Sequence, residues 1–378
     1  MKIAQVISTF PPYHGGMGYV CLHNAHELAM RGHDVTVFTL DHGRTDYTQD
    51  PRDFKIVRLK TPFRFGDGGV VPQLCSRLAA FDIVHLHYPF YGGAEYVYLA
   101  SILSGRKYFL TYHMDVYGDD LLKRMLINAY ELAFMRMIIR GAAGIGALSR
   151  QHLQSSKIAH FVDWSKVVEI PNGVDAELFR PREKDPLLLQ QHGLRGRFVV
   201  LFVGNLQPFK GLHLLIEALA RVKSKDIVLL VVGGGYGEEE YKGQVREKGL
   251  QDRVIFAGPQ SPSGDLPRYY SLGDVLALPS VRSEAFPLVV LEAMASGRPV
   301  LVSSLPGPSS LIEEGVDGVV ARVGDIDDLR QKMERLAQDP DQCRMMGEAA
   351  REKVRKRYNW SEIGGLLERK FEALISSR

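Results

Sequence analysis

The sequence contains few cysteines, little excess charge and no long apolar run. Its three cysteines, Cys21, Cys75 and Cys343, are widely spaced, so they favour a reducing compartment and offer neither a disulfide framework nor a metal site. The formal net charge of +3 over 378 residues is too small to indicate a nucleic-acid partner. No apolar run reaches the roughly 20 residues that a membrane-spanning helix needs.

The N-terminal segment MKIAQVISTF also lacks the apolar core and the small-residue cleavage site of a signal peptide. It predicts a strand instead. The expected location is therefore the cytoplasm, with peripheral attachment to the cytoplasmic face of a membrane left open.

Apolar residues make up 45% of the chain, which is enough to bury two cores. Apolar runs of strand length alternate with helical patterns, and this alternation indicates βαβ units with parallel sheets. The predicted strands span residues 2–9, 34–40, 55–59, 82–87, 108–111, 144–148, 167–170, 198–204, 227–233, 254–257, 275–278 and 300–303.

A charged stretch at residues 180–197 separates two blocks with the same alternation. We expect an α/β protein with two doubly wound, Rossmann-like domains, residues 1–185 and 195–360, that face each other across a cleft. Ligands of such sheets bind outside the carboxyl ends of the strands, and clefts between domains are favoured sites. An amphipathic helix at residues 361–378 is expected to pack back across the hinge.

The most informative stretch is PSVRSEAFPLVVLEAMASG, residues 279–297. It predicts a helix with Pro287 in its first turn and with Ser283 and Glu284 just before it, where caps and acidic residues are favoured. Glu292 then lies about two turns inside. A helix N-terminus beside a carboxylate can hold a phosphate and a sugar hydroxyl together. The same spacing also fits a capped helix with one buried, paired glutamate.

Glycine-rich turns follow the first strand of each block. Gly15 and Gly16 could bring backbone N–H groups to a phosphate, although the full G-x-G-x-x-G pattern is absent and a plain tight turn fits equally. VGNLQPFKG, residues 203–211, has the same place in the second block. Lys210 is expected at a helix start there, where its ammonium either meets a diphosphate or is solvated.

Histidines lie near the ends of two predicted strands. His113 could contact a sugar or a developing charge, or could be a core histidine satisfied by the backbone. His85 and His87 share a strand face, but without an evident third ligand they favour strand packing over a metal pair. The Asp-x-Asp of Asp325 and Asp327 precedes a helical pattern, and we interpret it as a helix cap.

A predicted helix at residues 119–140 combines many apolar residues with Lys123, Arg124, Arg136 and Arg140. Most of its apolar surface is expected to belong to the first core. A basic and apolar face could also lie on an anionic membrane.

Together these motifs resemble those of the retaining glycosyltransferases of family 4, which have the GT-B fold. The most specific match is Glu284, seven residues and Glu292 within SEAFPLVVLEAMASGRPV, which is the family's Glu-x7-Glu motif. VGNLQPFKG, PNGVD, VIFAGP and the early Gly-Gly loop follow in the family's order, so the resemblance covers nearly the whole chain.

The resemblance implies a site that needs no metal or other cofactor. Glu292 would hold the ribose of a nucleotide, and Glu284 would address the donor sugar together with the backbone of Phe286, Pro287 and Leu288. The family often has glycine where this chain has Pro287, which removes one possible N–H donor.

Further donor contacts follow from the same resemblance. Lys210 and, from the opposite domain, Gly16 would meet the diphosphate, and His113 would lie near the transferred sugar, so that His113, Glu284 and Lys210 form the catalytic set. The donor-binding residues would also include Gly15, Asn205, Phe256 and Gly258, with the base near the last two. Asn205 stands where the family often has arginine, so one phosphate loses a charged partner.

The implied activity is retaining transfer of a hexose from a nucleoside-diphosphate sugar to a glycan or a lipid-linked acceptor. GDP-mannose is the first expectation for the donor, followed by UDP-glucose or a UDP-N-acetylhexosamine. Two alternatives remain: a sugar-nucleotide epimerase of the same fold, and a catalytically silent subunit that binds nucleotide sugars.

Overall fold

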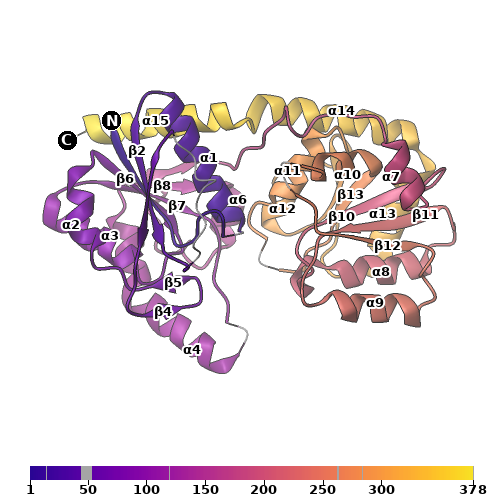
Figure 1. Cartoon of the computed structure of the whole chain (residues 1–378), viewed down its shortest axis with the longest axis horizontal. Helices are drawn as coiled ribbons and strands as arrows, with labels where there is room; N and C mark the ends of the chain where they lie inside the picture. Colours follow the sequence, from indigo (N-terminus) through magenta and orange to yellow (C-terminus); the bar gives the residue numbers. More distant parts are fainter. Residues whose placement is uncertain (14, 44–52, 119, 262–263, 283, 378) are drawn as a thin grey trace. The chain divides into compact units, whose positions relative to one another are not determined.

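The computed structural model describes residues 1–13, 15–43, 53–118, 120–261, 264–282 and 284–377. The chain divides into two compact units, one formed by Met1–Asn172 with Trp360–Arg378 and the other by Gly173–Asn359. Each unit contains a parallel sheet with helices on both faces (Figure 1). The prediction of two doubly wound α/β domains is therefore confirmed. Two positions with a prediction, Asp119 and Ser283, lie outside the described residues.

The first unit alternates strands and helices along the chain. Its elements are β1 (Lys2–Val6), α1 (Gly16–Met30), β2 (Asp34–Leu40), β3 (Lys55–Leu59), β4 (Arg64–Phe65), β5 (Gly68–Gly69), α2 (Leu74–Arg77), η1 (Leu78–Ala80), β6 (Ile83–Tyr88), α3 (Ala94–Ser104), β7 (Tyr108–Tyr112), α4 (Leu121–Tyr130), the π-helix η2 (Glu131–Met135), α5 (Arg136–Gly141), β8 (Gly144–Ala147), α6 (Arg150–Ser155), η3 (Trp164–Lys166), β9 (Val167–Glu169) and α15 (Trp360–Ser376). The main sheet has the order β3-β2-β1-β6-β7-β8-β9, and the strand order reverses between β1 and β6.

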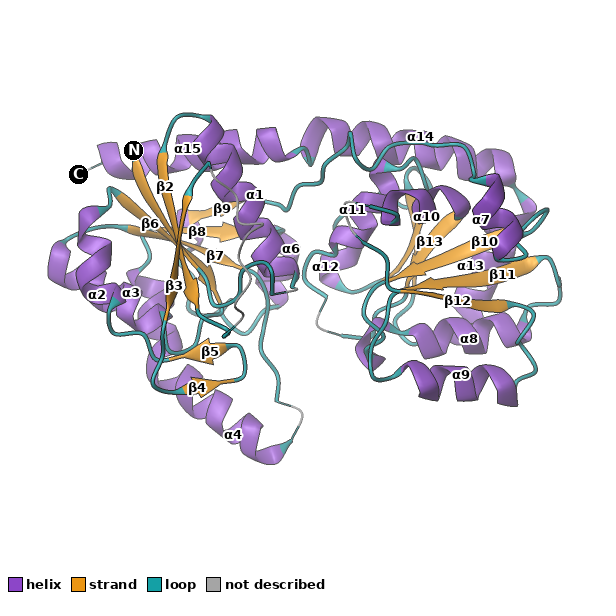
Figure 2. Ribbon diagram, in the orientation of Figure 1, coloured by secondary structure: helices purple, strands orange, loops and turns teal. Residues whose placement is uncertain are grey.

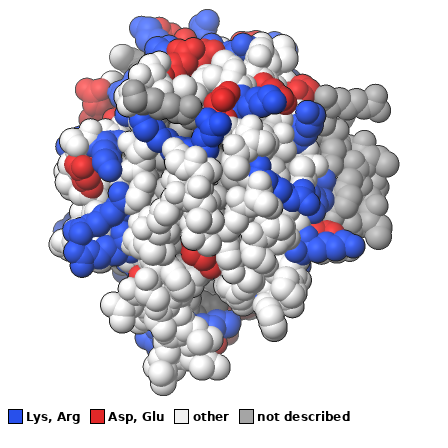
Figure 3. Space-filling view, turned by 90° about the vertical axis from the view of Figure 1, so that its left-hand side faces the viewer, with Lys and Arg blue, Asp and Glu red and all other residues white. Residues whose placement is uncertain are grey.

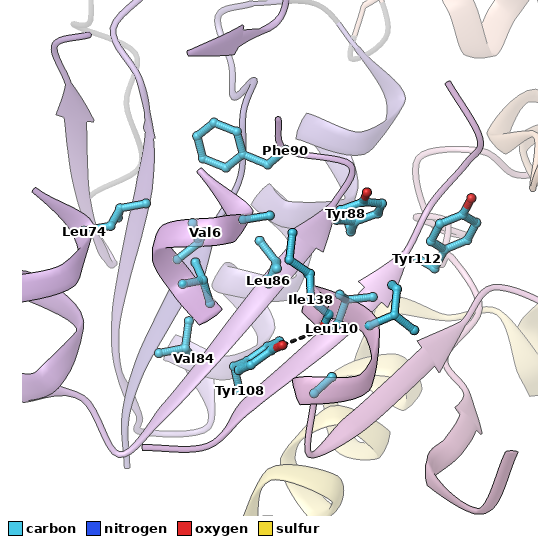
Figure 4. Close-up of a cluster of buried hydrophobic side chains, with 14 of the residues drawn as sticks. Val6, Leu74, Val84, Leu86, Tyr88, Phe90, Tyr108, Leu110, Tyr112 and Ile138 are labelled. Carbon is cyan, nitrogen blue, oxygen red and sulfur yellow. Dashed lines mark hydrogen bonds between the residues drawn. The ribbon is translucent and has the colours of Figure 1, made fainter. Parts of the chain in front are cut away.

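The core of the first unit is formed by buried side chains of both the strands and the helices that cover them. Figure 4 shows Leu86 and Leu110 from neighbouring strands beside Ile138 of α5, whose carbonyl accepts the Tyr108 hydroxyl. On the other face of the sheet, Phe371 of α15 is fully buried against Phe109. The C-terminal helix is thus a structural part of the first unit.

The second unit is built in the same way. Its elements are α7 (Pro186–Gln191), β10 (Phe198–Val203), η4 (Pro208–Lys210), α8 (Leu212–Arg221), β11 (Ile227–Val232), α9 (Glu238–Glu247), β12 (Val254–Gly258), α10 (Leu266–Leu272), β13 (Val275–Leu278), α11 (Leu288–Ala295), β14 (Val300–Ser303), α12 (Pro306–Ser309), β15 (Gly318–Ala321), α13 (Ile326–Gln338) and α14 (Pro340–Arg357). The sheet has the order β12-β11-β10-β13-β14-β15, so its reversal lies between β10 and β13. In Figure 2, α8 and α9 lie on one side of this sheet, and α10 and α11 lie on the other.

Most predicted strands are found within a few residues of their expected ends, and two further local expectations can be checked directly. Asp325 caps α13 through the backbone N–H of Asp328 at 2.9 Å, as predicted. The strand β15 and the small β4–β5 ladder were not predicted. The expectation that residues 119–140 serve mostly the first core is wrong for α4, which has no buried residue.

Candidate functional site

The candidate site of the second unit lies at the reversal point of its sheet, where the loops that follow β10 and β13 interlock. Gly211 has φ 79°, and a Cβ atom there would lie 2.0 Å from the carbonyl oxygen of Pro279. Nearby, the backbone N–H of Val281 donates to the carbonyl oxygen of Phe209 at 2.8 Å. In open α/β sheets, the carboxyl ends of the strands at such a reversal form the usual ligand site.

These two loops bring Lys210 and Glu284 together. Lys210 Nζ lies 2.5 Å from Glu284 Oε2, and Ser280 Oγ donates to the same oxygen at 3.0 Å. The side chains of Lys210 and Glu284 are only 18% and 10% exposed. Both predicted charges are therefore held in one partly desolvated spot, where charge-assisted hydrogen bonds are strong. Lys210 ends the short helix η4, and α8 begins after Gly211.

The backbone around Glu284 is fixed from the opposite side by α12. A Cβ atom at Gly307 would lie 2.1 Å from the carbonyl oxygen of Glu284 and 2.3 Å from that of Ala285. Phe286 follows, and its buried ring packs edge-on against Tyr358 with centroids 5.9 Å apart. These contacts leave the segment little freedom to move, so they orient the Glu284 carboxylate.

Pro287 stands one position earlier in the helix than predicted. It is the N-cap of α11, and Leu288 is the first helical residue. The backbone N–H groups of a first helical turn have no acceptor within the helix, so they are available to an anion. Pro287 itself has no N–H to add.

Glu292 lies in the middle of α11 and is bonded inside the unit. The Tyr270 hydroxyl donates to Glu292 Oε2 at 2.6 Å. Burial raises the pKa of Glu292 from 4.5 to about 7, and the bond from Tyr270 opposes this rise only in part. The two carboxylates of the motif therefore differ: Glu284 faces an ammonium, and Glu292 faces a hydroxyl.

Glycines line the adjacent strand ends of the same sheet. A Cβ atom at Gly233, after β11, would lie 1.9 Å from the carbonyl oxygen of Gly204, after β10. The Gly233 N–H donates to the carbonyl oxygen of Gly258, at the end of β12, at 3.0 Å. Asn205 is exposed beside these turns, and Phe256 is half-buried in β12. The backbones of the two turns thus approach so closely that position 233 has no room for a side chain.

The first unit has a glycine turn at its own reversal point. Gly15 is the N-cap of α1, and Gly16 is its first residue. A Cβ atom at Gly16 would meet no atom of the described residues within 4 Å, whereas one at Gly18 would lie 3.0 Å from the carbonyl oxygen of Thr9. Packing within the chain therefore explains the glycine at 18 and leaves open space at 16.

His113 follows β7 and belongs to a buried chain of polar side chains. Its Nε2 shares a 2.9 Å hydrogen bond with His87 Nδ1, and His87 Nε2 lies 2.7 Å from Gln5 Oε1. Burial lowers the pKa of His113 to about 3, with a further contribution from His152. At neutral pH, His113 is an uncharged hydrogen-bonding group. His85 is bonded to Thr111 instead, as expected for strand packing.

Four residues that support the candidate sites were not predicted from the sequence. They are Tyr270, Ser280, Gly307 and Gln5, and none of their contacts with the predicted residues follows from a local motif. The glycine at 307 within PGPS was a hint of close backbone approach, but what it approaches depends on the tertiary fold.

Family models and curated relatives match both halves of the chain. Residues 186–353 match the model described as glycosyl transferases group 1, and residues 14–178 match that of glycosyltransferase family 4. A D-inositol 3-phosphate glycosyltransferase of Nocardia farcinica is 28% identical over 368 residues, which cover 88% of this chain and 79% of that one. A GDP-mannose-dependent α-(1-6)-phosphatidylinositol monomannoside mannosyltransferase of Mycolicibacterium smegmatis is 26% identical over 377 residues, 96% of each chain.

Solved structures show the same architecture over the full length. HepE of Anabaena in complex with UDP superposes with a TM-score of 0.82 at 22% identity and covers 99% of this chain and 100% of its own. WaaG, a glycosyltransferase involved in lipopolysaccharide biosynthesis, gives a TM-score of 0.71 at 19% identity, with 95% and 97% covered. With its Glu-x7-Glu motif set at the reversal point of the second sheet, the chain belongs to the family 4 glycosyltransferases and has the GT-B fold.

Proposed function

We propose that this glycosyltransferase is a retaining, metal-independent hexosyltransferase that uses a nucleoside-diphosphate sugar. The observation that carries the proposal is the Lys210–Glu284 pair at the reversal of the second sheet, with Glu292 on the helix that follows. GDP-mannose is the first choice of donor, because the mycobacterial relative is named as GDP-mannose-dependent. UDP-glucose or a UDP-N-acetylhexosamine comes next, and HepE was crystallised with UDP-glucose. The proposed acceptor is a glycan or a lipid-linked sugar.

In this proposal the two carboxylates have separate tasks. Glu292, in α11, accepts hydrogen bonds from the ribose hydroxyls. Glu284 accepts from a hydroxyl of the transferred hexose, next to the backbone of Phe286, Pro287 and Leu288. The 2.5 Å ion pair positions the Lys210 ammonium for a diphosphate in the free protein. The base lies near Phe256 and Gly258, at the end of β12.

The proposed chemistry needs stabilisation of a leaving phosphate more than it needs a base. The bond between the sugar and the diphosphate breaks through an oxocarbenium-like state, and negative charge grows on the phosphate. The Lys210 ammonium and the first N–H groups of α11 meet that charge in a partly dry site, where preorganised donors are most effective. In a retaining reaction, a leaving phosphate oxygen can accept the acceptor's proton on the same face.

In the same proposal, the first unit contributes uncharged groups that bind the donor. Gly15 and Gly16 offer backbone N–H groups to phosphate oxygens, and the open space at Gly16 supports this role. His113 donates or accepts a hydrogen bond at the transferred sugar without carrying charge, because its pKa is about 3.

Nucleotide binding distinguishes the possible donors. We expect GDP and GDP-mannose to raise the unfolding temperature by several degrees in a thermal-shift panel, since ligand at about 100 times its Kd adds about 2.7 kcal/mol. If only UDP compounds raise the unfolding temperature, the donor is a UDP-sugar and not GDP-mannose, and the transferase proposal still holds. Formation of an epimer from donor without acceptor would instead favour the epimerase alternative.

Replacement of Lys210 tests the catalytic centre. Lys210→Ala should lower kcat by about 10²–10³-fold, because one preorganised partner of the leaving phosphate is lost. Lys248→Ala is the matched control, since Lys248 forms a surface ion pair with Glu217 at 2.6 Å in the same unit. Equal rates in the two variants, measured in steady state with a verified acceptor, would remove Lys210 from the mechanism.

The raised pKa of Glu292 predicts opposite pH trends in stability and donor affinity. Between pH 4.5 and about 7 the folded protein holds a proton that the unfolded chain has released, so stability falls as the pH rises. In urea unfolding, the wild type should therefore be less stable at pH 8 than at pH 5, by up to about 3 kcal/mol. Glu292→Gln should not show this difference, because its side chain does not titrate.

The wild-type affinity for the donor should increase as the pH rises through about 7, because the carboxylate accepts from both ribose hydroxyls. Isothermal titration calorimetry should show weaker binding without that increase in Glu292→Gln. Tyr270→Phe removes the bond that lowers the pKa and should move the affinity midpoint to higher pH. A Glu292→Gln variant with unchanged affinity would contradict the ribose assignment.

Gly16 and Gly18 form a matched pair in α1. Gly16→Ala meets no atom and improves helix propensity, so thermal unfolding should be unchanged or slightly raised, while KM for the donor rises about tenfold because a methyl group stands between the backbone and the phosphate. Gly18→Ala should instead lower stability, since its Cβ meets the Thr9 carbonyl at 3.0 Å. If the KM for the donor is unchanged in Gly16→Ala, the turn at Gly15 and Gly16 does not bind the donor phosphates.

A further inference from the structure

One surface of the first unit exposes large aliphatic side chains on two neighbouring helical segments. They are Leu99, Ile102 and Leu103 of α3, Leu122, Met125 and Leu126 of α4, and Leu132 of η2, with exposures from 41% to 87%. We call this set the aliphatic face. Large exposed apolar patches on a folded protein mark a surface that meets another apolar body.

Part of the aliphatic face forms a stripe along the helical arm made of α4, η2 and α5. Leu122, Met125, Ala129 and Leu132 recur at three- and four-residue intervals, which places them on one side of a helix. The arm is attached by its far end, where Ile138 and Ile139 of α5 are buried in the core. Because α4 has no buried residue, the described residues of the first unit leave this stripe uncovered.

The basic residues of the arm remain at the surface. Lys123, Arg124, Arg136 and Arg140 are all exposed. Arg136 and Arg140 line a shallow hollow of about 510 Å³ together with Tyr98 of α3 and Leu132. Cationic side chains thus lie beside the aliphatic ones on the same segment.

The acidic residues of the same region are turned inward and bonded. Glu131 accepts the Tyr91 hydroxyl at 2.8 Å and pairs with Lys157 at 3.1 Å. Glu95 accepts the Tyr130 hydroxyl at 2.5 Å. Asp120 is exposed, but it caps α4 and lies 3.5 Å from Lys123 Nζ. These bonds leave the aliphatic face bordered mainly by positive charge.

Figure 3 shows a broad uncharged area on one face of the molecule, interrupted by a small acidic area, with Lys and Arg side chains at its sides. The uncharged area extends to the lower end of that view, and α4 lies at the lower end of Figure 1. Among the described residues, no helix combines the length and the apolarity that crossing a bilayer requires. An apolar stripe with cationic borders is instead suited to lying in the interface of a membrane.

We propose that the aliphatic face docks on a lipid bilayer that contains anionic headgroups. The Leu and Met side chains enter the boundary between headgroups and acyl chains, and Lys123, Arg124, Arg136 and Arg140 meet the lipid phosphates. Charge complementarity favours a bilayer over a second copy of the chain, because two copies would bring like charges together. The proposal does not rest on the proposed function, since binding to vesicles requires neither donor nor acceptor.

Co-sedimentation of the full chain with vesicles tests this proposal. Vesicles with equal parts phosphatidylglycerol and phosphatidylcholine should bind the protein at low salt, and pure phosphatidylcholine should bind it far less. Arg136→Gln with Arg140→Gln should weaken binding about fivefold per residue, and added salt should have a similar effect. Leu126→Ser with Leu132→Ser should weaken it by more than about tenfold.

Leu187→Ser is the matched control, because Leu187 of α7 is 74% exposed in the second unit. It should leave vesicle binding unchanged, and all these variants should unfold at the wild-type temperature because their side chains are exposed. Two results would overturn the proposal. One is equal vesicle binding in wild type and both double variants; the other is absence of vesicle binding with concentration-dependent self-association that Leu126→Ser with Leu132→Ser abolishes.

Discussion

The site of the second unit depends on a backbone contact that only glycine allows. At Gly211 the chain has a positive φ and lies where a Cβ atom would overlap the Pro279 carbonyl, so a larger residue would push the loops after β10 and β13 apart. Lys210 precedes this glycine, and Glu284 lies five residues beyond Pro279. The 2.5 Å ion pair is therefore set by a steric constraint on the main chain, and the attraction of the charges acts on groups already placed together.

The two carboxylates of the motif lie in different electrostatic surroundings. Glu284 lies where both loops contribute polar groups, and an ammonium and a hydroxyl compensate its partial burial. Glu292 is carried into the unit by α11, where the Tyr270 hydroxyl is its hydrogen-bond partner among the described residues, so desolvation dominates and its pKa rises to about 7. The motif thus places one carboxylate beside an ammonium in the loop before α11 and the other inside that helix, where burial raises its pKa.

The sequence predicted what depends on local order along the chain. The alternation of strand and helix patterns predicted both sheets. The spacing of the motif predicted that Glu284 precedes α11 and that Glu292 lies inside it. It could not identify Tyr270 as the partner of Glu292, because that contact joins residues 22 positions apart through packing of α10 on α11. It also assigned α4 to the core, since apolar periodicity identifies a helix face but not what covers it.

The exposed arm shows why periodicity alone misled there. An amphipathic helix normally gains its stability by burying its apolar side, and α4 does not. It holds its helical form through the Asp120 cap and through continuity with α5, whose Ile138 and Ile139 are buried. The bonds from Tyr91 and Tyr130 to acidic residues fix η2 and α3 at the attachment point. Stability is thus supplied at one end of the arm, which leaves the aliphatic side of the other end free to meet a surface outside the unit.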